Sequence, residues 1–343
     1  MNYYRYLANR IGWAVLTLLF VIVLNFFLFR ILPGDPARAG IRDPRMTAAA
    51  VEAVRVRFGL DKPLINCFES LNPLRLGPCA TNPLQTQFLV YIGNLLRGEL
   101  GISYHTNRPV ADMLAERLGN TVLLIGAGQI FSILIGVGLG LIAAWKARTV
   151  IDYTSLIGSL FAWSLPTFWL GIILLFLGSR HLGLPIGGKL TPASHYASTW
   201  EEWLDVGRHL VLPTLTFTIV YMGEYMLIMR STVLEVLSED YILTAKAKGL
   251  SNLQILRDHA LRNTMLPMVT IIALNLGFTV GGAVQVETVF SWPGIGLAIF
   301  EAVGRRDYPM LSGAFLLLAV AVIFANLVAD LLYSVLDPRV RTS

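Results

Sequence analysis

Long apolar runs separated by short polar segments dominate the pattern of this sequence. A helix needs roughly 20 apolar residues to cross about 30 Å of hydrocarbon. Six stretches are long enough, at residues 11–29, 121–145, 153–177, 210–229, 264–286 and 310–336. The short alternating segments of a membrane β-barrel do not appear. The pattern therefore predicts an all-α polytopic membrane protein with six transmembrane helices.

The intervening polar segments divide the chain into four parts. Residues 1–31 hold the N-terminus and the first span, which is too long and too poor in small residues at its end for a cleaved signal peptide. Residues 32–119 form a small extracytoplasmic subdomain, with short helices expected at 47–58, 84–97 and 109–118. Residues 120–336 form a helical core with a charged segment at 231–263, and residues 337–343 form a tail.

Composition and charge agree with this class and orient it. The 343 residues are 55% hydrophobic and only 14% charged, with a net charge of +5. With the N-terminus inside, the short inner segments carry eleven Lys and Arg, and the two short outer loops carry five. This bias predicts that both termini are cytoplasmic. It also accounts for the basic character of the chain without nucleic-acid binding.

The two cysteines, Cys67 and Cys79, both lie in the outer segment, separated by eleven residues rich in Asn, Pro and Gly. In an oxidising compartment this spacing allows a disulfide. The alternative is a pair of free thiols.

Motifs for catalysis, nucleotide binding or metal binding are missing. Residues 183–189 have the Gly and Lys spacing of a phosphate-binding loop, but Leu190 stands where the magnesium-binding hydroxyl should be. The five histidines share no metal-ligand spacing, and neither GxSxG nor HExxH occurs. We therefore expect a non-catalytic chain with no catalytic residue, cofactor or metal of its own.

Polar residues inside the spans are the candidates for a transport pathway. Gln129 and Asn275, like Asn25, are uncharged, and hydrogen bonding between helices is the alternative role. Glu224 lies near the middle of its span, where an unpaired carboxylate is costly, and Arg230 lies on a different helix face. Glu224 either pairs with another subunit or faces an aqueous pathway and meets a cationic group of a substrate. A neutral buried Glu224 is the third alternative.

Three further features bear on helix packing. Gly136 and Gly140 form a GxxxG pair that allows close helix approach. Pro166 lies inside the third span. Trp292, before a Pro-Gly turn, is expected at the membrane interface.

The charged segment between spans four and five is more elaborate than a simple turn. A helix is predicted at 238–248, continuing from span four and ending at Gly249 in a left-handed conformation. Ser251 or Asn252 then caps a second short helix that ends at Asn263. This shape suggests a docking surface for a soluble partner. An amphipathic helix lying on lipid is the alternative.

The sequence resembles the membrane subunits of bacterial ABC importers, specifically the peptide/nickel family of B-type permeases for dipeptides and oligopeptides. The matching segments are 33–36 (PGDP), 61–63 (DKP), 98–103 (GELGIS), 240–250 (DYILTAKAKGL), 259–263 (HALRN) with Leu266-Pro267, 287–294 (ETVFSWPG) and 306–309 (RDYP). They cover nearly the whole chain in order. Two departures stand out: Leu243 occupies the acidic first position of the family's "EAA" loop, and residues 66–87 look like an insertion.

The resemblance implies a type I ABC importer permease that forms half of a translocation pathway in the bacterial inner membrane. Its partners would be a second homologous (C-type) permease, two ABC ATPases that bind ATP and Mg²⁺, and an extracytoplasmic substrate-binding protein. The cargo would be a di- or oligopeptide; nickel chelates or other small solutes, or proton-coupled carriage, are alternatives. The implied ATPase-docking residues are Thr244, Ala245, Lys248, Gly249, Leu250, Ser251, Leu253, Leu256, His259 and Arg262.

Overall fold

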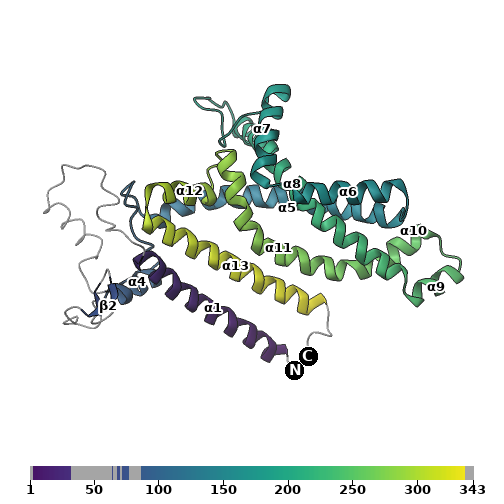
Figure 1. The fold of residues 1–343 in the computed structure, drawn as a ribbon, viewed down its shortest axis with the longest axis horizontal. Coiled ribbons are helices and arrows are strands. Elements are labelled where there is room, and N and C mark those ends of the chain that lie inside the picture. Colours follow the sequence, from purple (N-terminus) through teal and green to yellow (C-terminus); the bar gives the residue numbers. More distant parts are fainter. Residues whose placement is uncertain (1–2, 32–63, 65–67, 70–71, 77–85, 337–343) are drawn as a thin grey trace. The chain divides into compact units, whose positions relative to one another are not determined.

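The described part of the protein is almost entirely helical (Figure 1). The computed structural model describes residues 3–31, 64, 68–69, 72–76 and 86–336. The elements are α1 (Tyr3–Ile31), β1 (Phe68–Glu69), β2 (Asn72–Leu76), α4 (Gln87–Leu96), α5 (Val110–Trp145), α6 (Val150–Ser164), α7 (Thr167–Leu182), α8 (Thr199–Leu237), α9 (Asp240–Ala247), α10 (Asn252–Gln254), the π-helix η2 (Ile255–Ala260), α11 (Leu261–Val289), α12 (Ile295–Arg305) and α13 (Tyr308–Leu336).

The long apolar helices confirm the predicted class of fold. Within the described residues, α1, α5, α8 and α13 each contain a stretch long and apolar enough to cross a membrane, and the bent pair α6–α7 could form one more span. The remaining predicted span, 264–286, lies within the 29-residue helix α11. Four of the six predicted spans thus coincide with apolar helices of membrane-crossing length, a fifth coincides with the bent pair, and the sixth coincides with a long helix.

The third predicted span is not one straight helix. Helices α6 and α7 change direction by 101° at Leu165-Pro166, a break that Figure 1 shows clearly. Leu165 has an extended backbone (φ −75°, ψ 132°), because the proline ring disfavours helical geometry in the residue before it. The predicted continuous helix over 153–177 is therefore wrong at this point.

The region before the core also differs from the prediction in its boundaries. Helix α4 begins after Thr86, whose hydroxyl accepts from the Leu89 amide. The helix predicted at 109–118 is not separate, since α5 runs through to Trp145. Helix α12 was not predicted, and neither was the short antiparallel pair of strands β1 and β2. The helix predicted at 47–58 and both cysteines lie outside the described residues.

The chain divides into two compact units, Met1–Gly12 with Asn120–Pro293 and Val322–Ser343, and Trp13–Gly119 with Gly294–Ala321. In the first unit, α6, α7, α8 and α11 pack together around buried aromatic and aliphatic side chains. The largest fully buried ones include Phe217, Tyr225, Met229, Phe290 and Trp292.

Trp292 belongs to this core and not to the membrane interface. Its side chain is fully buried, and its indole N–H donates to the Asn120 carbonyl over 2.9 Å. Asn120 in turn donates to the Pro293 carbonyl. Nearby, the buried carboxylate of Glu287 accepts from the Thr121 hydroxyl over 2.7 Å. The expected interfacial role of Trp292 is therefore wrong, because its polar atom is satisfied inside the protein.

In the second unit, two of the family-like segments meet at the start of α13. The buried carboxylate of Asp307 accepts from the Ser103 hydroxyl over 2.5 Å and from the Tyr104 amide over 3.1 Å. It also accepts from the Met310 amide in the first turn of α13. One carboxylate thus caps a helix and fixes the loop that follows α4.

Candidate functional site

The connection between α8 and α11 (residues 238–260, called here the α8–α11 connection) has a defined hydrogen-bonded shape. Helix α9 is a separate helix, because the helical conformation is interrupted at Ser238 and Glu239 after α8. The prediction of a continuous helix over 238–248 is wrong at this point. Helix α9 ends in a Schellman motif: Leu250 N–H donates to the Ala245 carbonyl and Gly249 N–H to the Lys246 carbonyl. Gly249 has φ +80°, the left-handed conformation that the sequence predicted.

The second half of the connection begins with a capping box. The Gln254 side chain accepts from both the amide and the hydroxyl of Ser251, and the Gln254 amide donates back to that hydroxyl. From Asn252 the helical backbone passes through η2 into α11 without a break. The prediction that this helix ends at Asn263 is wrong, because the helix that starts at the Ser251 cap continues into α11.

A small core holds the two halves together. Ile242, Ala245 and Ile255 are buried against one another, with Leu250 packed at the edge. Asn263 adds a hydrogen bond of 2.7 Å to the Tyr241 hydroxyl. Burial of Ala245 means that it cannot be a direct contact for a partner, so its part in the predicted docking set would be structural.

The other predicted docking residues line the surface of the connection or its edge. Leu250, Leu256 and His259 are half-buried. Among the large apolar side chains, Leu243 and Leu253 are 69% and 64% exposed. The exposed members of the predicted set are Thr244, Lys248, Gly249, Ser251, Leu253 and Arg262.

This surface is basic as well as apolar. Between Asp240 and Arg262 the sequence has four Lys and Arg residues and two Asp residues. The Arg257 guanidinium lowers the pKa of Asp258 below its usual value through a paired hydrogen bond. The pair is therefore ionised at neutral pH, and its two charges cancel.

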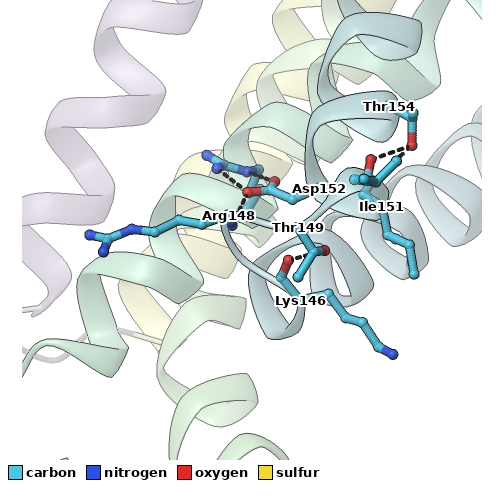
Figure 2. Close-up of polar contacts among 8 residues, drawn as sticks. Lys146, Arg148, Thr149, Ile151, Asp152 and Thr154 are labelled. Atoms are coloured by element: carbon cyan, nitrogen blue, oxygen red, sulfur yellow. Dashed lines mark hydrogen bonds and ion pairs between the residues drawn. The ribbon is translucent and has the colours of Figure 1, made fainter.

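A buried ion pair joins the N-terminal end of α6 to α8. Asp152, with 1% of its side chain exposed, accepts two hydrogen bonds from Arg230, at 2.5 and 2.8 Å. It also accepts from the Arg148 amide over 2.8 Å, at the turn before α6. Figure 2 shows Asp152 beside Arg148 at this turn, together with Thr149, whose hydroxyl donates to the Lys146 carbonyl. Asp152 therefore fixes the α5–α6 turn and α8 together.

Sequence reasoning missed this pair, although a signal for it was present. Asp152 begins an apolar run, and a carboxylate buried there needs a cation. Arg230 is the basic residue at the end of the fourth predicted span. A search for opposite charges at corresponding ends of different spans would have found the Asp152–Arg230 pair.

The three pathway candidates meet in one polar cluster, formed by Gln129, Glu224, Tyr225 and Asn275 (called here the polar cluster). The Asn275 amide donates to Glu224 Oε2 over 3.0 Å. Gln129 Nε2 donates to the Tyr225 hydroxyl, and Asn275 also interacts with that hydroxyl. Helices α5, α8 and α11 each contribute at least one of these side chains.

Glycines on α5 place Gln129 beside Tyr225. A Cβ on Gly136 would lie 2.6 Å from the Met222 carbonyl oxygen and 2.7 Å from Tyr225 Cβ. A Cβ on Gly140 would lie 2.7 Å from both the Met226 carbonyl oxygen and Met229 Cβ. The predicted GxxxG pair is therefore where α5 approaches the backbone of α8.

We expect Gly136→Val to reduce the yield of folded protein strongly, since the added side chain meets α8 backbone and not a flexible group. Overpacking of this kind costs about 1–3 kcal/mol or more. Gly138→Val is the matched control, because nothing lies within 4 Å of a Cβ at Gly138 on the same helix. The measurement is the monodisperse fraction after detergent extraction. Equal fractions for the two variants would contradict the close α5–α8 contact.

The structure also bears on nucleotide binding and on metal binding. In the loop that resembles a phosphate-binding loop, the Gly188 amide donates to the Phe290 carbonyl, and a Cβ on Gly187 would lie 2.7 Å from the same oxygen. This backbone is used for packing, so it is not arranged around a phosphate. In the described part of the chain, no three His, Cys, Asp or Glu side chains group as metal ligands.

Comparison with known proteins adds a family to this geometry. The model of the family described as binding-protein-dependent transport system inner membrane component matches residues 136–342. The model of the corresponding N-terminal component matches residues 3–125.

Several relatives are similar to this chain over nearly their whole length. The chain is 33% identical over 354 residues to the dipeptide transport system permease protein DppB of Escherichia coli K12, covering 98% of each chain. It is 37% identical to the di/tripeptide transport system permease protein DppB of Pseudomonas aeruginosa, with the same coverage. It is 36% identical to the glutathione transport system permease protein GsiC of Escherichia coli O6:H1, covering 98% of this chain and 99% of GsiC.

A solved structure supports the fold. The MetNI methionine ABC transporter in an inward-facing conformation aligns with a TM-score of 0.52 and 16% identity, over 66% of this chain and 96% of the other. At this identity the similarity shows the fold alone. The family models and the full-length relatives show that the chain belongs to the family of inner membrane components of binding-protein-dependent transport systems, as a non-catalytic, multi-pass permease subunit.

Proposed function

We propose that this chain is one of two non-identical permease subunits of an ATP-driven importer for di- and oligopeptides. The relatives named above as dipeptide and di/tripeptide permeases match over 98% of this chain. The cargo proposal rests on this full-length similarity. ATP and Mg²⁺ would be bound by two partner ATPase subunits, since the sequence carries no nucleotide-binding motif of its own.

The observation that carries this proposal is the α8–α11 connection. It presents exposed Leu243 and Leu253 among basic residues, and its two halves are held by a buried core. Its helical backbone continues directly into α11. A soluble ATPase that binds this surface differently in two states would shift the equilibrium between two permease conformations.

The same proposal assigns the membrane orientation, the outer segment and the lining of the pathway. The bias of Lys and Arg favours cytoplasmic termini in a bacterial inner membrane, with residues 32–119 and the binding protein on the outer side. The insertion at 66–87 would contact the binding protein or cover the outer gate; a tolerated surface insertion is the alternative. The core at 120–336 would line half of the pathway, with the second permease lining the rest.

The direct test is to purify the tagged chain from its own host and reconstitute what co-purifies into liposomes. We expect two ATPase subunits and a second permease to co-purify, and peptide uptake to need ATP inside and a loaded binding protein outside. Uptake driven by a proton gradient alone, with no ATPase present, would identify a secondary carrier instead.

A broader cargo range is the second candidate, favoured by the similarity to the glutathione permease. Uptake of dipeptides, glutathione and nickel chelates by the same liposomes separates these cases. The cargo that competes with all others at the lowest concentration is the assigned one.

A further inference from the structure

Among the described residues, Glu224 has no basic partner, in contrast to Asp152. Asp152 is buried and paired with Arg230. Glu224 is half-buried, and among the described residues its hydrogen-bond partner is the neutral amide of Asn275. A carboxylate within a membrane span is costly unless it faces water or meets a positive charge. Within the described residues, the structure therefore leaves the Glu224 carboxyl group on α8 without a basic partner.

A second, independent feature lies beside it. Gln129 is 2% exposed, and its carbonyl oxygen has no hydrogen-bond partner among the described residues, although its amide nitrogen donates to Tyr225. A buried acceptor left unpaired costs about 1–3 kcal/mol. The polar cluster thus combines an uncompensated carboxylate with a buried carbonyl oxygen that lacks a donor.

A small cation with several N–H donors would supply both the positive charge that Glu224 lacks and the hydrogen-bond donor that the Gln129 carbonyl oxygen lacks. A primary ammonium carries a positive charge, three donors and no acceptor. A metal cation fits less well, since the described residues contain no group of three acidic, His or Cys ligands. The amino terminus of a peptide has the required chemistry, and so ties the cluster to the proposed cargo.

We propose that the polar cluster binds the α-ammonium group of the peptide during its passage, with Glu224 supplying the charge and Gln129 an acceptor. This inference rests on the proposed peptide-import function. The packing of α5 on α8 through Gly136 fixes the two side chains on opposing helices. Asn275 holds one Glu224 oxygen, which leaves the other oxygen for the ligand.

The test compares Glu224→Gln, Glu224→Asp and Gln129→Met in the reconstituted complex. Binding of each peptide to the soluble binding protein is titrated first, and uptake is measured with that protein fully loaded. Loss of a charge-assisted hydrogen bond predicts about a tenfold fall in uptake for Glu224→Gln and a smaller fall for Gln129→Met. Glu224→Asp keeps the charge and should recover part of the uptake.

Controls separate this role from assembly. Glu235→Gln makes the same change at an exposed position of α8 and should leave uptake unaltered. The variants should also keep ATP hydrolysis stimulated by the loaded binding protein. Loss of the second permease from purified Glu224→Gln complexes would overturn the inference, because Glu224 would then pair across a subunit interface.

Two further outcomes distinguish a failure of the ammonium assignment from a failure of the proposed function. Wild-type uptake of Glu224→Gln at full assembly overturns the ammonium assignment and leaves the peptide importer intact. Absence of peptide uptake by the wild-type complex overturns the proposed function, and the ammonium assignment fails with it.

Discussion

Gly249→Val is expected to lower ATP-driven uptake by about five- to thirtyfold while the complex still assembles. Gly249 has φ +80°, and a Cβ there would meet no atom within 4 Å. The cost of a side chain is therefore conformational: a left-handed backbone costs an L-residue about 1–2 kcal/mol, and every 1.4 kcal/mol is about tenfold in an equilibrium. Relief of that strain would break the Schellman motif and change how α9 is set against α11.

A series at this position distinguishes conformation from size. Gly249→Asn should retain most of the uptake, because Asn adopts left-handed geometry more readily than other residues. Gly249→Ala should lie between Asn and Val. The measurements are peptide uptake and ATP hydrolysis in the same liposomes. Equal uptake by the Val and Asn variants would show that the left-handed turn has no part in coupling.

Asp152→Asn is the second substitution with a large expected effect. It removes the charge that pairs with Arg230, and breaking a buried ion pair by removing one partner costs about 3–5 kcal/mol. We expect little folded protein in detergent and a lowered unfolding temperature of what remains. The double variant Asp152→Leu with Arg230→Met should recover much of the stability, because no unpaired charge is then left.

An exposed pair provides the matched control. Arg257 and Asp258 have side chains that are 72% and 47% exposed, and exposed pairs contribute about 0–1 kcal/mol. Asp258→Asn should therefore leave the unfolding temperature nearly unchanged. A double variant at Asp152 and Arg230 that is as unstable as the single one would contradict the ion-pair explanation.

The hydrophobic pattern predicted the class of fold because membrane spans are specified by length and apolarity alone. It was wrong where local backbone chemistry decides between a bend and a continuous helix. Pro166 broke a span that looked continuous, whereas Gly119 and Asn120 did not break α5. A proline restricts its neighbour directly, but a glycine in a helix only weakens it, and packing can compensate.

For the candidate site, the sequence predicted the features that adjacent residues determine, but not those that depend on helix packing. The left-handed Gly249 and the cap at Ser251 depend on adjacent residues, so the sequence predicted the first and narrowed the second to Ser251 or Asn252. The grouping of Gln129, Glu224 and Asn275 depends on how α5, α8 and α11 pack, which no single segment encodes. The Asp152–Arg230 pair was missed for the same reason.

The unbroken helix from Asn252 to Val289 has a mechanical consequence. At 1.5 Å per residue, the distance along it from Leu256 to Asn275 is about 28 Å. A tilt of about 10° about an axis near Leu256 would then displace Asn275 by roughly 5 Å, close to one helical turn. Such a displacement exceeds the length of its hydrogen bond to Glu224. The helix would act as a lever arm, so a small movement of the α8–α11 connection is sufficient to open and close the polar cluster.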